Sequence, residues 1–81
     1  MVVLIELFGI LRDIAKIEKV NMPITDETVV RDALEYVRKL YPDLLLDESL
    51  ILTTVNHELV PLDRLLKSND TVCILPPIGG G

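Results

Sequence analysis

Two stretches near the start of the chain carry the apolar, β-branched pattern of strands. Val2 to Phe8 is an almost continuous apolar run and predicts a first strand. Residues 17–22 alternate more loosely and predict a second strand that ends at Pro23. We interpret Gly9 to Ala15, between them, as a turn, so that the two strands form a hairpin across a rather long loop.

The next segment has the spacing of an amphipathic helix. It starts in the cluster Thr25-Asp26-Glu27-Thr28, in which the Thr28 hydroxyl is the predicted N-cap. Arg31 occupies the third helical position, so a full capping box is not expected. Pro42 ends the helix after about 13 residues. The predicted apolar face consists of Val30, Ala33, Leu34, Val37 and Tyr41.

A second hairpin is predicted after an irregular apolar segment. Ile51 to Val55 indicates a strand, Asn56-His57 a tight turn, and Glu58 to Val60 a short return strand. A connector follows, in which we expect a helical turn at Leu62 to Leu66.

The last predicted strand runs from Thr71 to Leu75. If Val72 and Ile74 face the helix, then Leu75 lies on the opposite face of the sheet. The same alternation is expected to place Phe8 beside it, which would give an apolar docking patch.

The order of these elements predicts a fold class. Two early strands are joined through a crossover helix to later strands, which favours an α+β roll with a mixed sheet packed on one main helix. A single helix covers one face of such a sheet, so the other face needs polar residues or a partner. We expect one domain over residues 1–81.

Composition narrows the function classes. The net charge is −5 and there is no run of Lys or Arg, so we expect no nucleic-acid partner. The single cysteine cannot form an internal disulfide, the first residues lack the basic region of a signal peptide, and no apolar stretch approaches a membrane span. We therefore expect a cytoplasmic protein with no membrane partner. A core of this size supplies roughly 3–5 kcal/mol, so the chemistry should be peripheral or supplied by a partner.

The most informative segment is the end of the sequence, a predicted flexible tail over residues 76–81. Pro76-Pro77 favours an extended exit, and Ile78-Gly79-Gly80-Gly81 can extend roughly 13 Å into a narrow channel. A terminal carboxylate has a pKa of about 3.3–3.7 and is a poor electrophile as the anion. Acyl transfer from Gly81 therefore needs a leaving group such as AMP. The sequence has no phosphate-binding loop to hold ATP, so we expect external activation.

The sequence resembles a known family, the ubiquitin-like β-grasp sulfur carriers (MoaD/ThiS-like), and within it the small subunit of molybdopterin synthase. The Pro-Pro-x-x-Gly-Gly ending is the most specific motif, and Gly79 falls where relatives often carry another small residue. The motifs are Phe8-Gly9-Ile10-Leu11-Arg12-Asp13, Thr28-Val29, Val55-Asn56 with Leu59-Val60, Asn69-Asp70-Thr71, and Pro76-Pro77-Ile78-Gly79-Gly80-Gly81.

The resemblance implies a sulfur carrier that has no active site of its own. A ubiquitin-activating-like (E1-like) adenylyltransferase, MoeB/ThiF-like, would use ATP to adenylate the Gly81 carboxylate, and a sulfur donor would convert it to a thiocarboxylate. The tail would then enter the large, MoaE-like subunit of molybdopterin synthase, where the sulfur passes to the pterin precursor. Relatives instead supply sulfur for thiamine or tRNA, or are joined to lysines as protein modifiers. A plain ubiquitin-like binding domain is a further alternative.

Several residues have two interpretations. Arg12 matches a loop arginine of the family and pairs with an acidic group on the partner, or it is a solvated charge. Phe8 and Leu75 belong to a partner interface, or they are ordinary packing of the sheet. The other expected partner-binding residues are Pro76, Pro77 and Ile78.

Two further side chains are weak candidates for chemistry. Cys73 is a small strand residue in preference to a sulfur relay, and His57 is a surface turn residue. One Cys and one His do not make a metal site, and we expect no cofactor on the chain itself. The lysines at 16, 19, 39 and 67 are solubilising charges in preference to conjugation sites.

Overall fold

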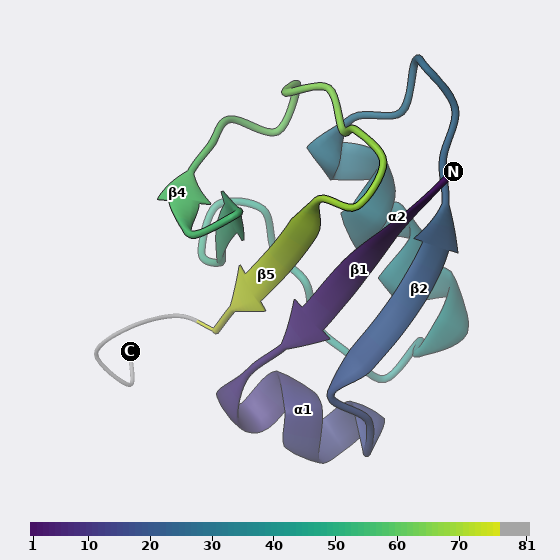
Figure 1. Ribbon diagram of the computed structural model, residues 1–81. Coiled ribbons are helices and arrows are strands. Elements are labelled where there is room, and N and C mark those ends of the chain that lie inside the picture. Colours follow the sequence, from purple (N-terminus) through teal and green to yellow (C-terminus); the bar gives the residue numbers. More distant parts are fainter. Residues whose placement is uncertain (77–81) are drawn as a thin grey trace.

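A five-stranded mixed sheet forms the centre of the molecule, and one long helix packs on one of its faces (Figure 1). The structure is a computed structural model and describes residues 1–76. The strand order is β2-β1-β5-β3-β4. The elements are β1 (Val2–Leu7), α1 (Gly9–Ala15), β2 (Lys19–Pro23), α2 (Val30–Leu40), β3 (Leu52–Val55), β4 (Glu58–Leu59) and β5 (Thr71–Leu75).

The two central strands, β1 and β5, come from opposite ends of the chain and run parallel, with Leu4 paired to Thr71 and Leu7 to Ile74. The other neighbours in the sheet are antiparallel. A parallel pair requires a crossover connection, and α2 lies within it. The predicted α+β architecture, a mixed sheet on one main helix, is therefore confirmed.

The core lies between the sheet and α2. Alternate residues of the two central strands face the helix because successive side chains of a strand point to opposite faces. Val72 and Ile74 are among them, so the condition under which Leu75 lies on the opposite face is met. The side chains that are 2% exposed or less are Val3, Ile5, Leu7, Val30, Ala33, Leu34, Val37, Val55, Val72 and Ile74.

The segment predicted as a turn, Gly9 to Ala15, is instead a short helix, α1. Leu11 is buried and anchors it to the core. Lys16 ends it in a left-handed conformation (φ 61°), where its N–H donates to the carbonyl oxygen of Arg12 at 2.8 Å. The sequence did not reveal this helix because two turns are too short for a clear 3.6-residue pattern, and an initial glycine is usually a helix breaker.

The start of α2 is one residue later than predicted. Val29 is the N-cap, and its N–H donates to the Asp32 carboxylate at 2.8 Å. The Thr28 hydroxyl accepts instead from the Thr25 N–H at 2.9 Å, which stabilises the turn before the helix. The predicted cap at Thr28 was therefore wrong: the carboxylate of Asp32 provides the reciprocal half of a capping box.

The connector after β4 has no helical turn at Leu62–Leu66, and that prediction was also wrong. Its carbonyl groups are used by α2: the N–H groups of Val30 and Arg31 donate to the carbonyl oxygens of Arg64 and Leu62 at 3.0 and 2.9 Å. The first N–H groups of a helix have no partner within the helix. The connector satisfies two of them, and these hydrogen bonds hold it against the start of α2.

The turn between β3 and β4 is as predicted. Asn56 and His57 both have left-handed backbones, with φ of 51° and 72°. A two-residue hairpin turn with two positive φ values matches the right-handed twist of the strands, and asparagine tolerates this conformation well. The turn fixes the register that places Leu59 opposite Thr54.

A buried carboxylate, Asp70, ties this hairpin to the connector. It accepts hydrogen bonds from the Asn56 amide (2.9 Å), the Arg64 guanidinium (3.1 Å) and the Lys67 N–H (2.8 Å). Burial by itself would raise the pKa of the Asp70 carboxyl, but these hydrogen bonds and the charge of Arg64 together hold that pKa below its ordinary value. The ionised form of Asp70 therefore stabilises the fold.

We expect Asp70→Ala to lower the free energy of unfolding by about 2 kcal/mol at pH 7, because three donors lose their acceptor. Since the folded-state pKa is lowered, the Asp70 contribution is complete above the unfolded-state pKa of about 3.9 and disappears as the pH falls through the folded-state pKa. Urea unfolding of both proteins between pH 7 and pH 2.5 measures this: the difference between them should shrink as the pH falls.

Asp63→Ala is the matched control, because Asp63 is exposed on the same connector. A surface substitution of this kind changes stability by less than about 0.5 kcal/mol. A gap between wild type and Asp70→Ala that stays constant down to pH 2.5 would contradict the role assigned to the ionised carboxylate.

Candidate functional site

The face of the sheet opposite α2 is the candidate binding surface; it faces the viewer in Figure 1. Residues paired across neighbouring strands project to the same side. Leu52 of β3 is paired with Leu75 of β5, and Thr54 is paired both with Cys73 of β5 and with Leu59 of β4. Apolar side chains from three strands are therefore adjacent on this face.

Phe8 joins them at the end of β1. Its backbone is still extended (φ −126°, ψ 157°), so it continues the alternation of the strand before α1 begins. The parallel register pairs Leu7 with Ile74, and one further step places Phe8 beside Leu75. Both side chains are half-buried. The structure thus brings together the two residues that the sequence predicted as a docking patch.

We call Phe8, Leu52, Leu59, Cys73 and Leu75 the open-face cluster. Leu59 is the most accessible member, with 69% of its surface exposed, whereas Cys73 is only 6% exposed. Leu52 and Leu59 were not predicted from the sequence as partner-binding residues. The sequence does contain information that could have identified both, because the two-residue turn at Asn56-His57 fixes which residues of β3 and β4 share a face.

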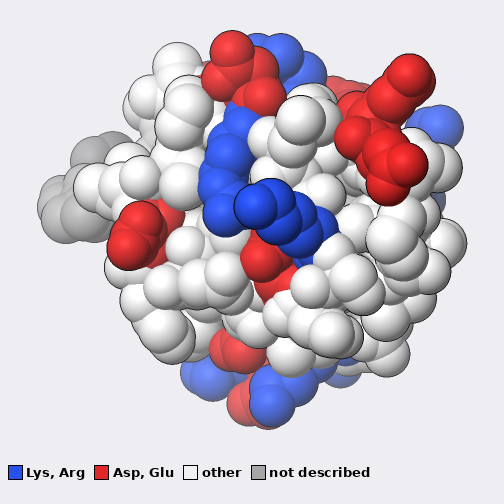
Figure 2. Space-filling model, turned by 45° about the horizontal axis from the view of Figure 1, so that its top comes forward, with Lys and Arg blue, Asp and Glu red and all other residues white. Residues whose placement is uncertain are grey.

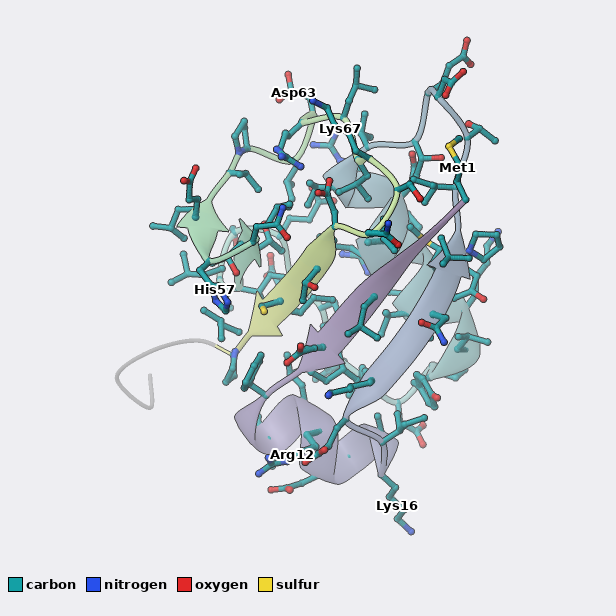
Figure 3. All side chains as sticks on the ribbon, viewed as in Figure 1. Met1, Arg12, Lys16, His57, Asp63 and Lys67 are labelled. Carbon is teal, nitrogen blue, oxygen red and sulfur yellow. The ribbon has the colours of Figure 1, made fainter. Side chains whose placement is uncertain are left out.

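Arg12 lies on α1, at the end of the sheet where β1 and β5 finish (Figure 3). Its guanidinium is 3.6 Å from the Glu18 carboxylate, and both side chains are largely exposed. Arg12 is therefore a helix residue with an acidic neighbour in its own chain, and it remains accessible to a partner. Lys16 projects from the same helix, whereas Asp63 and Lys67 lie at the opposite end of the molecule (Figure 3).

Charges of both signs are interspersed on one face of the molecule. On the face shown in Figure 2, basic and acidic side chains lie next to one another among uncharged residues. The open-face cluster itself is uncharged, and the register places Glu6 of β1 beside Cys73 on its edge. The surface that a partner would meet is thus apolar with a polar border.

Pro76, which is half-buried, is the last residue that the structure describes. The site residues predicted at Pro77, Ile78, Gly79, Gly80 and Gly81, and with them most of the predicted flexible tail, lie outside the described residues. Within residues 1–76, Phe8, Leu75 and Pro76 are brought to one end of the sheet, and Arg12 lies at that same end on α1.

Comparison with known proteins places this geometry in a family. Residues 5–81 match the sequence profile of the ThiS family, which is nearly the whole chain. The chain belongs to the ThiS family. The resemblance to MoaD/ThiS-like sulfur carriers is therefore confirmed, and so is the ubiquitin-like β-grasp fold.

Solved structures similar to this ThiS-family chain include three at 26–27% identity. Small archaeal modifier protein 1 from Methanosarcina acetivorans has 26% identity and a TM-score of 0.82, covering 99% of this chain and 96% of its own. A chain in a complex of subunits 1 and 2 of molybdopterin-converting factor from Helicobacter pylori has 27% identity and a TM-score of 0.63. The match covers 100% of this chain and 100% of that chain. The BexX/CysO complex of Amycolatopsis orientalis has 27% identity and a TM-score of 0.69, covering 98% and 99%. No curated protein matches the sequence.

Two further features are absent from residues 1–76 of the ThiS-family chain. Among residues 1–76, no three His, Cys, Asp or Glu side chains are grouped so that they could hold a metal ion. In the same residues, neither helix has the length and apolarity needed to cross a bilayer.

Proposed function

We propose that this protein is a sulfur carrier and acts as the small subunit of a molybdopterin synthase. The carboxylate of Gly81 attacks the α-phosphate of ATP on an E1-like, MoeB/ThiF-like enzyme, which releases pyrophosphate and forms an acyl adenylate. Sulfide-level sulfur from a donor then displaces AMP and leaves a thiocarboxylate. The large subunit, MoaE-like, accepts the tail and uses this sulfur to build the dithiolene of molybdopterin.

Membership of the ThiS family is the observation that carries the proposal, because the match extends to Gly81 and so includes the glycine end. The molybdopterin-converting factor of H. pylori supports the choice of acceptor, since a chain like this one is there in complex with a second subunit. The open-face cluster supplies the apolar surface on which such a partner can dock.

The proposal divides the work between this chain and its partners. The chain supplies a carboxylate and a docking surface, and the activating enzyme supplies the ATP site. Glycine at the reacting end suits this division, because a residue without Cβ can pass through a narrow channel into the partner's active site. The proposed location is the cytoplasm.

A protein modifier joined through Gly81 to lysines of other proteins is the second candidate. It is favoured by the likeness to small archaeal modifier protein 1 of M. acetivorans at 26% identity. Both functions share every step as far as the acyl adenylate and differ in what displaces AMP: sulfide-level sulfur, or the amine of a lysine. Sulfur transfer to a thiazole or to tRNA shares the thiocarboxylate and differs in the acceptor.

The deciding experiment is the intact mass of the protein after incubation with its activating enzyme, ATP and sulfide. We expect a gain of about 16 Da, the difference between sulfur and oxygen, localised to Gly81 by fragmentation, because AMP is a far better leaving group than the oxygen of a carboxylate. The thiocarboxylated protein is then mixed with the large subunit and the pterin precursor, and loss of the added mass with formation of the dithiolene supports the proposed acceptor.

Each other outcome has a defined meaning. If sulfide leaves the AMP adduct unchanged and lysine-linked products form in lysate, the proposed function is wrong and the protein is a modifier. An unchanged mass, with an activating enzyme shown to be active on another carrier, overturns both and leaves a binding domain.

A further inference from the structure

The parallel register of the two central strands has a consequence at their ends. Leu7 of β1 is paired with Ile74 of β5, so two further steps bring Gly9 next to Pro76. Neighbouring strands lie about 4.8 Å apart, and a proline ring fills much of that gap. Pro76 has no N–H to continue the ladder, so pairing stops where the ring begins.

The contact between these two residues leaves little room for a side chain at position 9. A Cβ added to Gly9 would lie 3.0 Å from Cγ and 3.8 Å from Cδ of Pro76. Nonbonded carbon atoms normally stay about 3.5–4.0 Å apart. The near atom belongs to a closed ring, which can change its pucker but cannot swing away as the end of a flexible side chain would. A Cβ at position 9 would therefore require the Pro76 ring to move by a few tenths of an ångström.

Displacement of Pro76 changes the direction in which the chain leaves the sheet. The pyrrolidine ring fixes the φ angle of Pro76, and the ring also restricts Leu75 before it to extended conformations. The backbone at 75–76 therefore behaves as a stiff unit whose orientation depends on what the ring packs against. In this structure the ring packs against Gly9.

We infer that Gly9 is a positioning residue: through its contact with Pro76, it sets the exit direction of the tail that carries the reactive carboxylate. The inference rests on the proposed function, since it concerns delivery of Gly81 to an activating enzyme. Gly9 touches no reacting atom and acts only through Pro76.

A simpler role for Gly9 must be separated from this one. Its φ is +58°, a conformation that glycine adopts without strain and that alanine adopts at a cost. Gly9→Ala adds both strain and a Cβ beside Pro76. Gly9→Asn adds the same Cβ, but asparagine tolerates the left-handed backbone better. The two substitutions therefore differ in strain and share the contact.

The test measures KM and kcat of the activating enzyme for the carrier. Release of pyrophosphate reports the rate of adenylation. If Gly9→Ala reduces the population with the productive exit direction to about one tenth, KM rises about tenfold and kcat is unchanged. We expect the same rise for Gly9→Asn, with a smaller loss in melting temperature. In a Pro76→Ala background, which has no ring to displace, Gly9→Ala should raise KM less than about twofold relative to Pro76→Ala alone.

An equal rise in KM in both backgrounds, or a KM for Gly9→Asn equal to that of wild type, would overturn the inference and leave Gly9 as a purely conformational requirement. Failure of wild-type adenylation would instead overturn the proposed function. The inference is then decided by NMR on labelled protein. Two observations together support it. The first is a nuclear Overhauser effect between the Gly9 Hα and Pro76 Hγ protons. The second is a change in the amide chemical shifts of residues 78–81 in Gly9→Ala that is absent when the same substitution is made in the Pro76→Ala background. Absence of both refutes it.

Discussion

We expect deletion of Gly81 to reduce the rate of acyl-adenylate formation by at least about 100-fold. One residue spans about 3.3–3.6 Å in an extended chain, so the deletion withdraws the carboxylate from the α-phosphate by far more than the 1 Å that already costs about 100-fold. The measurement is pyrophosphate release by the activating enzyme, with the intact mass of the product as a second readout.

The three consecutive glycines make this deletion a test of length alone. Removal of any one of Gly79, Gly80 and Gly81 gives the same sequence, and that sequence still ends in Gly-Gly. The matched control is Gly79→Ala, which keeps the length and the last two residues and should react within about threefold of wild type, because it adds only one methyl group two residues before the carboxylate. Activation of the shortened chain at the wild-type rate would refute a reactive terminal carboxylate held at a fixed reach.

The second large effect is expected at the open-face cluster. Leu59→Glu should weaken binding to the activating enzyme and to the large subunit by about 30-fold or more. A leucine within an interface contributes by excluding water, and a glutamate in its place would be buried there without a partner charge. Leu59 is 69% exposed, so the substitution should leave the free protein folded. Titration calorimetry with each partner measures the loss.

Leu45→Glu is the control for this prediction. Leu45 is 87% exposed and lies in the loop between α2 and β3, outside the open-face cluster. It tests whether any exposed leucine changed to glutamate weakens binding. Equal losses for both variants would mean that the open-face cluster is not the docking surface, and so would wild-type affinity of Leu59→Glu.

The parts of the fold that the sequence predicted are those in which local pattern and burial agree. The apolar run of β1, the amphipathic face of α2 and the alternation of β5 each have a buried side and a long enough pattern to show it. The errors at α1 and at the connector are in segments whose conformation depends on residues far away in the chain. α1 is held by one buried leucine, Leu11, and the connector after β4 is held by the N-terminal amides of α2.

The candidate site shows the same division. Phe8 and Leu75 could be predicted to share a face because each follows the alternation of its own strand. Their adjacency required the parallel pairing of β1 with β5, which no local pattern specifies. Leu59 was missed because β4 has only two residues, and its membership of the open face depends on the turn register and on the β3–β5 pairing. The contact between Gly9 and Pro76 likewise depends on a register between the two ends of the chain.

The central β1–β5 pair also bears on when the protein can fold. Leu4 and Thr71 are paired across 67 positions of the chain (71 − 4), so the middle of the sheet is among the most non-local contacts in the molecule. Such contacts form late and slowly, because the loop between them must close first. A chain interrupted before Thr71 lacks the strand that holds β1 and β3 together. Completion of the domain is thus coupled to synthesis of β5, and in a folded molecule the strand that leads to Pro76 and the glycines is already held in the sheet.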